Sequence, residues 1–178
     1  MKRMLGVIVS TFFVMSAYAS TSFNTVGSDD ATAIAGFDVV AFFTAKKALR
    51  GDPKYSVEYG GAKWIFSSEE NLTAFKAKPE SYLPAWGGHC AWAVSEKTIS
   101  TKKLSGDFEI LSGKLYLFSF GRNAKSDAKD DFLYGRYSRN SRLRDGEQAW
   151  PGIKANLESG SLTQPDSASY TKSQFERP

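Results

Sequence analysis

The stretch of sequence with the most evident chemical potential runs from Gly87 to Trp92 and reads GGHCAW. It contains the only histidine and the only cysteine of the 178 residues, His89 and Cys90. Imidazole nitrogens and thiolates are ligands of zinc and copper, and a thiol paired with an imidazole can act as an activated nucleophile. Cysteine is also one of the most frequently buried residue types. Three alternatives are therefore open: a metal site, a reactive thiol, or a packed core.

The adjacency of His89 and Cys90 restricts what they can do together. Adjacent side chains point to opposite faces of a strand and diverge by about 100° on a helix, so only a turn would bring the imidazole to the thiol. Two ligands also do not complete the four-coordinate geometry of structural zinc. A homodimer that shares both residues across its two-fold axis would supply four ligands for zinc or copper.

A third candidate metal ligand is Asp38, which lies in the apolar block Gly36–Phe43. A buried carboxylate without partners is costly, so this side chain must find ligands or donors. It can add an oxygen to a metal site with His89 and Cys90, or it can cap a turn by accepting hydrogen bonds from backbone N–H groups. Because the block is short and rich in valine and phenylalanine, it predicts a buried turn or strand over residues 38–43.

The N-terminus, residues 1–19, is typical of a secretory signal peptide. A basic start at Lys2 and Arg3 precedes an apolar run, and the small-x-small triplet Ala17–Ala19 follows it. The apolar run is shorter than the roughly 18–20 residues that span a bilayer. We therefore expect cleavage after Ala19 and a periplasmic or secreted mature chain without a membrane span.

Charge and cysteine content limit the function classes of the mature chain. Loss of Lys2 and Arg3 lowers the formal charge of +4 by two, and acidic residues offset the arginine cluster of residues 136–144. We therefore expect that cluster to be a solvated face and expect no nucleic-acid partner. One cysteine permits no internal disulfide, so apolar packing must hold the fold.

Turn signals and apolar periodicity predict an α+β fold. Residues 55–59 and 62–66, joined by Gly-Gly, predict a β-hairpin, and residues 108–111 and 114–118 predict a second one. A capped helix is expected at about 68–78, where Ser67 and Glu70 have capping-box spacing. We expect the two hairpins to form a small antiparallel sheet, with further helix after residue 123.

The domain organisation follows from the placement of these elements. Residues 20–31 are polar and predict a flexible lead-in, and residues 32–156 hold all the periodic segments and predict a single domain. Residues 157–178 are rich in Ser, Thr, Gln and Pro and predict a disordered tail.

The segment Tyr55–Tyr82, YSVEYGGAKWIFSSEENLTAFKAKPESY, resembles a YHS domain. The blocks AIAGFDVVAFF and GGHCAWAVS resemble an exported, single-domain branch of that family. The resemblance implies a β-hairpin paired with a helix, in a family that occurs beside metal-transport and metal-dependent oxygenase modules. Metal-binding members place cysteines at positions that correspond here to Ala41, Ser67 and Asn71, so the family's thiolate site is not expected in this chain.

Together these features favour an exported YHS-like binding or accessory protein that takes a weakly held metal or a small ligand near His89 and Cys90. The alternative is a structural or interaction module that contacts an unknown protein partner through the basic, tyrosine-containing stretch Tyr134–Arg139. A thiol-dependent enzyme that uses Cys90 ranks third. Its thiol needs a base within hydrogen-bond reach, and the sequence contains no second histidine that could serve in place of His89.

Overall fold

The computed structural model describes residues 20–121 and 127–166, so the predicted signal peptide lies outside the described residues. No helix in this part of the chain is long and apolar enough to cross a membrane. The elements in chain order are η1 (Ala33–Gly36), α1 (Val39–Thr44), β1 (Asp52–Tyr59), β2 (Ala62–Phe66), α2 (Glu69–Ala77), η2 (Pro79–Ser81), η3 (Ala85–Gly88), α3 (Ala91–Ser95), β3 (Leu104–Leu111), β4 (Lys114–Ser119), α4 (Ala128–Tyr134) and α5 (Arg139–Glu158).

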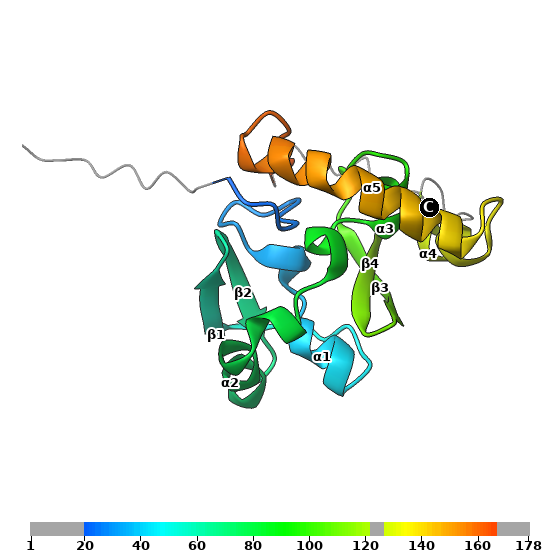
Figure 1. The fold of residues 1–178 in the computed structure, drawn as a ribbon. Helices are drawn as coiled ribbons and strands as arrows, with labels where there is room; N and C mark the ends of the chain where they lie inside the picture. Colours follow the sequence, from blue (N-terminus) through cyan, green and yellow to red (C-terminus); the bar gives the residue numbers. More distant parts are fainter. Residues whose placement is uncertain (1–19, 122–126, 167–178) are drawn as a thin grey trace, which may run out of the picture.

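Both predicted hairpins are confirmed, and the fold is α+β. Strands β1 and β2 pair antiparallel, with Tyr59 opposite Ala62, and strands β3 and β4 pair antiparallel, with Leu111 opposite Lys114. Each hairpin forms its own two-stranded sheet, so the single small sheet expected from the sequence is not formed. Figure 1 shows the β1–β2 hairpin beside α2 at one side of the molecule and the β3–β4 hairpin below α5 at the other.

Two clusters of buried apolar side chains hold these halves. The first is centred on the aromatic rings of β2 and α2, where Trp64 stacks on Phe75 at a centroid distance of 5.5 Å. The second joins β4 to the C-terminal helices, where the Phe118 and Phe132 rings lie 5.5 Å apart. Full burial of side chains of this size contributes roughly 1.5–3 kcal/mol each. Because one cysteine cannot form an internal disulfide, these clusters stabilise the fold by packing.

The block around Asp38 forms a helix where a buried turn or strand was expected. Residues Val39–Thr44 form α1, and the Asp38 side chain caps its N-terminus by accepting from the backbone N–H groups of Val40 and Ala41. The cap satisfies N–H groups that would otherwise be buried without partners, and it allows one and a half turns of helix to form from residues of low helix propensity. The capping alternative for Asp38 is therefore confirmed.

Helix α2 agrees with the expected range, but its cap is one residue later than the capping-box spacing indicates. Ser68, not Ser67, is the N-cap, and its Oγ accepts from the N–H of Asn71 at 3.3 Å. Ser67 instead turns toward the buried carboxylate of Asp38. A hydrogen bond to a buried charge is stronger than a surface cap, which explains the difference.

The two ends of the described chain are packed together, which differs from the flexible lead-in and the disordered tail expected there. In the lead-in, Asn24 is 1% exposed and its Nδ2 donates to the Gly88 carbonyl at 3.1 Å. At the other end Leu157 is buried, and Gln164 Nε2 donates to the carbonyl of Phe23 at 2.8 Å. The polar composition of both segments serves these mutual hydrogen bonds. Residues 167–178 of the predicted tail lie outside the described residues.

Candidate functional site

The first buried polar centre surrounds Asp38, whose side chain is fully inaccessible to solvent. Its Oδ1 accepts from the N–H groups of Val40 at 2.9 Å and Ala41 at 3.2 Å. Its Oδ2 accepts from the N–H of Ser67 at 2.8 Å, from Ser67 Oγ at 2.6 Å and from Asn71 Nδ2 at 2.6 Å. Five donors therefore solvate one carboxylate and join α1 to the end of β2 and to α2.

This centre contains the three positions at which the resemblance to metal-binding YHS domains implies cysteines. The three positions implied by the resemblance, Ala41, Ser67 and Asn71, all donate to the Asp38 carboxylate. The oxygens that a cation would need already accept hydrogen bonds, and a cation would displace those donors in a buried site. Within the described residues, no group of three or more His, Cys, Asp or Glu side chains is arranged to hold a metal ion.

His89 forms a second buried polar centre, with a side chain that is 1% exposed. Its Nε2 lies 3.2 Å from the carbonyl oxygen of Ser22, and its ring lies 5.9 Å from the ring of Trp150. Burial lowers the pKa of His89 to about 4, although the Ser22 carbonyl opposes that shift. The ring is therefore neutral at pH 7, and we assign its proton to Nε2 because that atom faces an acceptor.

The two glycines before His89 allow the N-terminal segment to reach this centre. Gly87 has a φ of +61°, and a Cβ atom there would lie 2.3 Å from the Ser22 carbonyl oxygen. The same turn accepts a backbone hydrogen bond from Asn24 to Gly87 at 2.8 Å. The GG of GGHCAW thus has a structural role, because only glycine permits both the left-handed turn and the close approach.

Cys90 differs from His89 in its surroundings. It precedes α3, its backbone bridges to Leu117 of β4, and its side chain is 2% exposed. It also lines a cavity of about 470 Å³ between α3, the segment 98–102 and the end of β4. His89 is not among the lining residues, so the adjacent imidazole and thiol do not share this cavity. The metal role of His89, Cys90 and Asp38 stays a prediction.

Comparison with known proteins gives a family for part of the chain. Residues 40–86 match the model of the YHS domain family. The chain contains a YHS domain. No curated protein and no solved structure matches the chain. The YHS match begins within α1 and ends in η3, so His89, Cys90 and the cavity lie outside the residues that the family describes.

In the region after the YHS domain, a buried arginine links α5 to the end of α3, and no sequence pattern predicted it. Arg142 on α5 was expected in a solvated cluster, but it is 6% exposed. Its Nη1 donates to Ser95 Oγ at 3.0 Å and pairs with Glu96 at 2.9 Å. Both partners lie more than 40 residues away on and after α3, so no local pattern could have identified this link.

Proposed function

We propose that this chain is an exported accessory protein that binds a small, largely apolar ligand in the cavity beside Cys90. The observation that carries the proposal is the cavity of about 470 Å³ that Cys90 lines. Its volume lies within the range of small-molecule sites, roughly 300–1,000 Å³. Its walls combine apolar side chains with hydroxyl groups, among them Ile99, Phe120, Thr98 and Ser119.

The donor set of this cavity suits a neutral organic ligand better than a metal ion. Cys90 is the one thiol of the chain, and Asp131 is the one carboxylate among the lining residues. The ammonium group of Lys102, another lining residue, donates to the Gly121 carbonyl at the same wall. One thiol and one carboxylate beside a cation do not provide the four ligands of a zinc site. A copper or zinc ion shared between two chains would also require His89, which is 1% exposed, to leave its buried position.

A thiol-dependent reaction at Cys90 has less support. The imidazole that would act as its base faces Ser22 and Trp150 instead of lining the cavity. An activated nucleophile needs its base within hydrogen-bond reach. We therefore assign Cys90 a place in the wall of a binding site.

A neutral fluorescent probe, N-phenyl-1-naphthylamine, tests the proposal by titration into the purified mature chain. The substitution Ala128→Leu adds volume to the cavity wall, and Ala155→Leu places the same change on an exposed site of α5. We expect the probe to bind the wild type and the Ala155→Leu control, and Ala128→Leu to weaken binding about tenfold, or ~1.4 kcal/mol. Absence of probe binding, or equal affinity in both variants, would contradict the proposal.

Export has a separate test. Fractionation of cells that express the full chain, followed by N-terminal sequencing, should give a mature protein outside the cytoplasm that begins at Ser20. A protein that keeps Met1 and remains in the cytoplasm would refute export without affecting the cavity.

A second candidate function is protein interaction through the stretch Tyr134–Arg139. Tyr134 is 81% exposed and Tyr137 is 53% exposed, and the Arg136 guanidinium lies 5.8 Å from the Tyr137 ring. Exposed tyrosines beside arginines are typical of protein interfaces. If this surface binds a partner, Tyr134→Ala should weaken the complex while probe binding at the cavity stays unchanged.

A further inference from the structure

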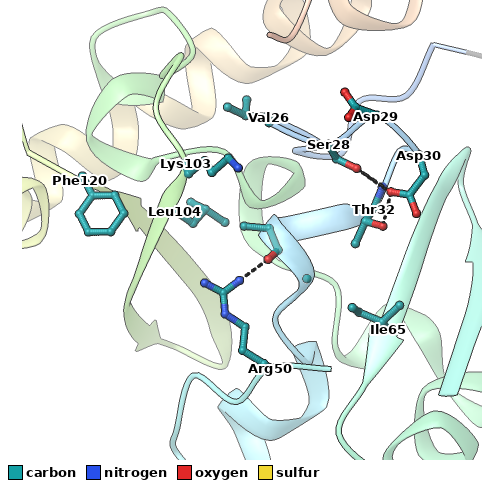
Figure 2. A pocket seen from close by; sticks show the side chains of 13 residues that line it. Val26, Ser28, Asp29, Asp30, Thr32, Arg50, Ile65, Lys103, Leu104 and Phe120 are labelled. Atoms are coloured by element: carbon teal, nitrogen blue, oxygen red, sulfur yellow. Dashed lines mark hydrogen bonds between the residues drawn. The ribbon is translucent and has the colours of Figure 1, made fainter. Parts of the chain in front are cut away.

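A second cavity, of about 530 Å³, lies between the segment 26–36 and the beginning of β3. Figure 2 shows Arg50 extending into it from one side, with Ser28, Asp30 and Thr32 on the opposite wall. The cavity beside Cys90 is formed by other elements, although Phe120 lines both. The Arg50 cavity is lined by four charged side chains, Asp29, Asp30, Arg50 and Lys103, whereas the cavity beside Cys90 is lined by two, Lys102 and Asp131.

The guanidinium of Arg50 is held in place before any ligand binds. Its Nη1 donates to the carbonyl of Ala35, and its Cζ lies 3.9 Å from the centroid of the Phe37 ring. Within the described residues, no carboxylate forms an ion pair with it. A stacked and anchored guanidinium keeps its remaining N–H donors in a fixed plane, which reduces the entropy lost on binding.

The backbone that anchors Arg50 is strained. Ala31, Ile34 and Ala35 have φ values of 55°, 44° and 55°, in the left-handed region that residues with a Cβ rarely adopt. Hydrogen bonds hold this conformation: Ile34 N–H donates to Asn24 at 2.7 Å, and Lys63 N–H donates to Ala31 at 2.9 Å. Strained backbone of this kind persists where the surroundings enforce it, and it concentrates at binding sites. Here it turns the Ala35 carbonyl toward Arg50.

The opposite wall carries a negative charge that is already compensated. Asp30 pairs with Lys63 at 2.8 Å and accepts from Ser28 Oγ at 2.8 Å and Thr32 Oγ1 at 2.6 Å. The hydrogen bonds from Lys63 and Thr32 hold the pKa of Asp30 far below its usual range, so its carboxylate stays ionised. Together with Asp29, it disfavours a ligand that carries two negative charges.

The remaining lining is apolar. Val26 is 1% exposed and Leu104 is 3% exposed, and Ile65 also lines the cavity. At the rim, the Phe120 ring is 51% exposed. These side chains would cover the body of a ligand whose charged group meets Arg50.

We propose that this cavity binds a singly charged organic carboxylate with a compact apolar body. The planar fork of Arg50 matches the two oxygens of a carboxylate, and Val26, Leu104 and Ile65 would bury the body. With Asp30 paired to Lys63, the cations Arg50 and Lys103 outnumber the remaining anion, Asp29, by one, so the site favours one added negative charge over two. This second site goes beyond the neutral-ligand cavity proposed above.

Titrations followed by ¹H–¹⁵N NMR on the mature chain test this site with three probes: phenylacetate, its neutral analogue phenylacetamide, and inorganic phosphate. We expect phenylacetate to shift the resonances of Val26, Lys103 and Leu104, and to bind about tenfold more tightly than phenylacetamide. Phosphate should bind more weakly than phenylacetate. This comparison uses the wild type alone, so it does not depend on the folding of any variant.

Substitutions of Arg50 test whether its guanidinium binds the carboxylate of phenylacetate. Arg50→Gln should weaken phenylacetate binding about tenfold, Arg50→Lys should have an intermediate effect, and the exposed control Arg136→Gln should have none. Equal binding of phenylacetate and phenylacetamide would overturn the proposal. So would tighter binding of phosphate, an unchanged affinity in a folded Arg50→Gln variant, or shifts confined to Cys90 and Ile99.

Discussion

Asp38 and His89 are both polar side chains in the interior, with exposures of 0% and 1%, but the structure treats them differently. Asp38 accepts five hydrogen bonds from backbone and side-chain donors. Within the described residues, His89 has one hydrogen-bond partner, the Ser22 carbonyl, and its Nδ1 has none. A buried charge survives where donors surround it, whereas a buried imidazole with few partners stays neutral. The hydrogen bonds of Asp38 therefore stabilise the packing of α1 against β2 and α2, whereas protonation of His89 at acid pH would destabilise the fold.

The largest effect should come from removal of the Asp38 carboxylate. Asp38→Ala leaves its former donors buried without an acceptor, which should lower the free energy of unfolding by about 3 kcal/mol or more. Urea denaturation of the purified protein measures this loss. The exposed control Asp107→Ala should change the free energy by about 0.5 kcal/mol or less. A loss below about 1 kcal/mol in Asp38→Ala would show that the five hydrogen bonds contribute little to the stability of the fold.

A comparable but pH-dependent effect should come from His89. Its pKa falls from 6.5 to about 4 in the folded chain, so the unfolded chain binds a proton at a higher pH than the folded chain does. Stability should therefore be unaffected by His89 above pH 7 and should fall between pH 6.5 and pH 4, by on the order of 3 kcal/mol.

The matched variant for this prediction is His89→Gln, which cannot titrate. Its free energy of unfolding, measured by urea denaturation from pH 4 to pH 8, should show a smaller acid-dependent loss than that of the wild type. Parallel pH profiles for the two proteins would mean that other groups cause the loss.

Removal of a single side-chain donor to Asp38 should lower the free energy of unfolding by less than removal of the carboxylate. Asn71→Ala removes one side-chain donor at 2.6 Å and leaves the other four in place. We expect a loss of about 1–2 kcal/mol by urea denaturation, less than for Asp38→Ala. Ser67→Ala should act similarly, and the double variant should depart from additivity because both side chains share Oδ2. Full additivity would argue against a shared centre.

Local patterns predicted the parts of this molecule that depend on neighbouring residues. The Gly60–Gly61 turn, the hairpin around Ser112–Gly113 and the capped helix α2 follow from turn chemistry and periodicity. Helix α1 was missed because its apolar block is too short to show a helical period, and its stability depends on the Asp38 cap.

The candidate sites depend on contacts that no local pattern contains. Ser22 meets His89 across 67 residues, and Arg142 meets Ser95 across 47. The cavity beside Cys90 arises where α3, the segment 98–102, the end of β4 and α4 come together, and the Arg50 cavity arises where the segment 26–36 meets the beginning of β3. The sequence indicated that the family's thiolates are replaced here by Ala41, Ser67 and Asn71. Only the structure shows that all three residues donate hydrogen bonds to the Asp38 carboxylate.

The proposed function requires that the thiol of Cys90, which is 2% exposed, faces a cavity that small molecules can enter. The rate at which the native thiol reacts with methyl methanethiosulfonate tests it most directly, with and without saturating N-phenyl-1-naphthylamine. We predict complete modification of the folded chain and a marked slowing by the probe, because both molecules enter the same cavity. Modification that occurs only after denaturation, or a rate that the probe does not change, would show that the cavity beside Cys90 does not admit such ligands.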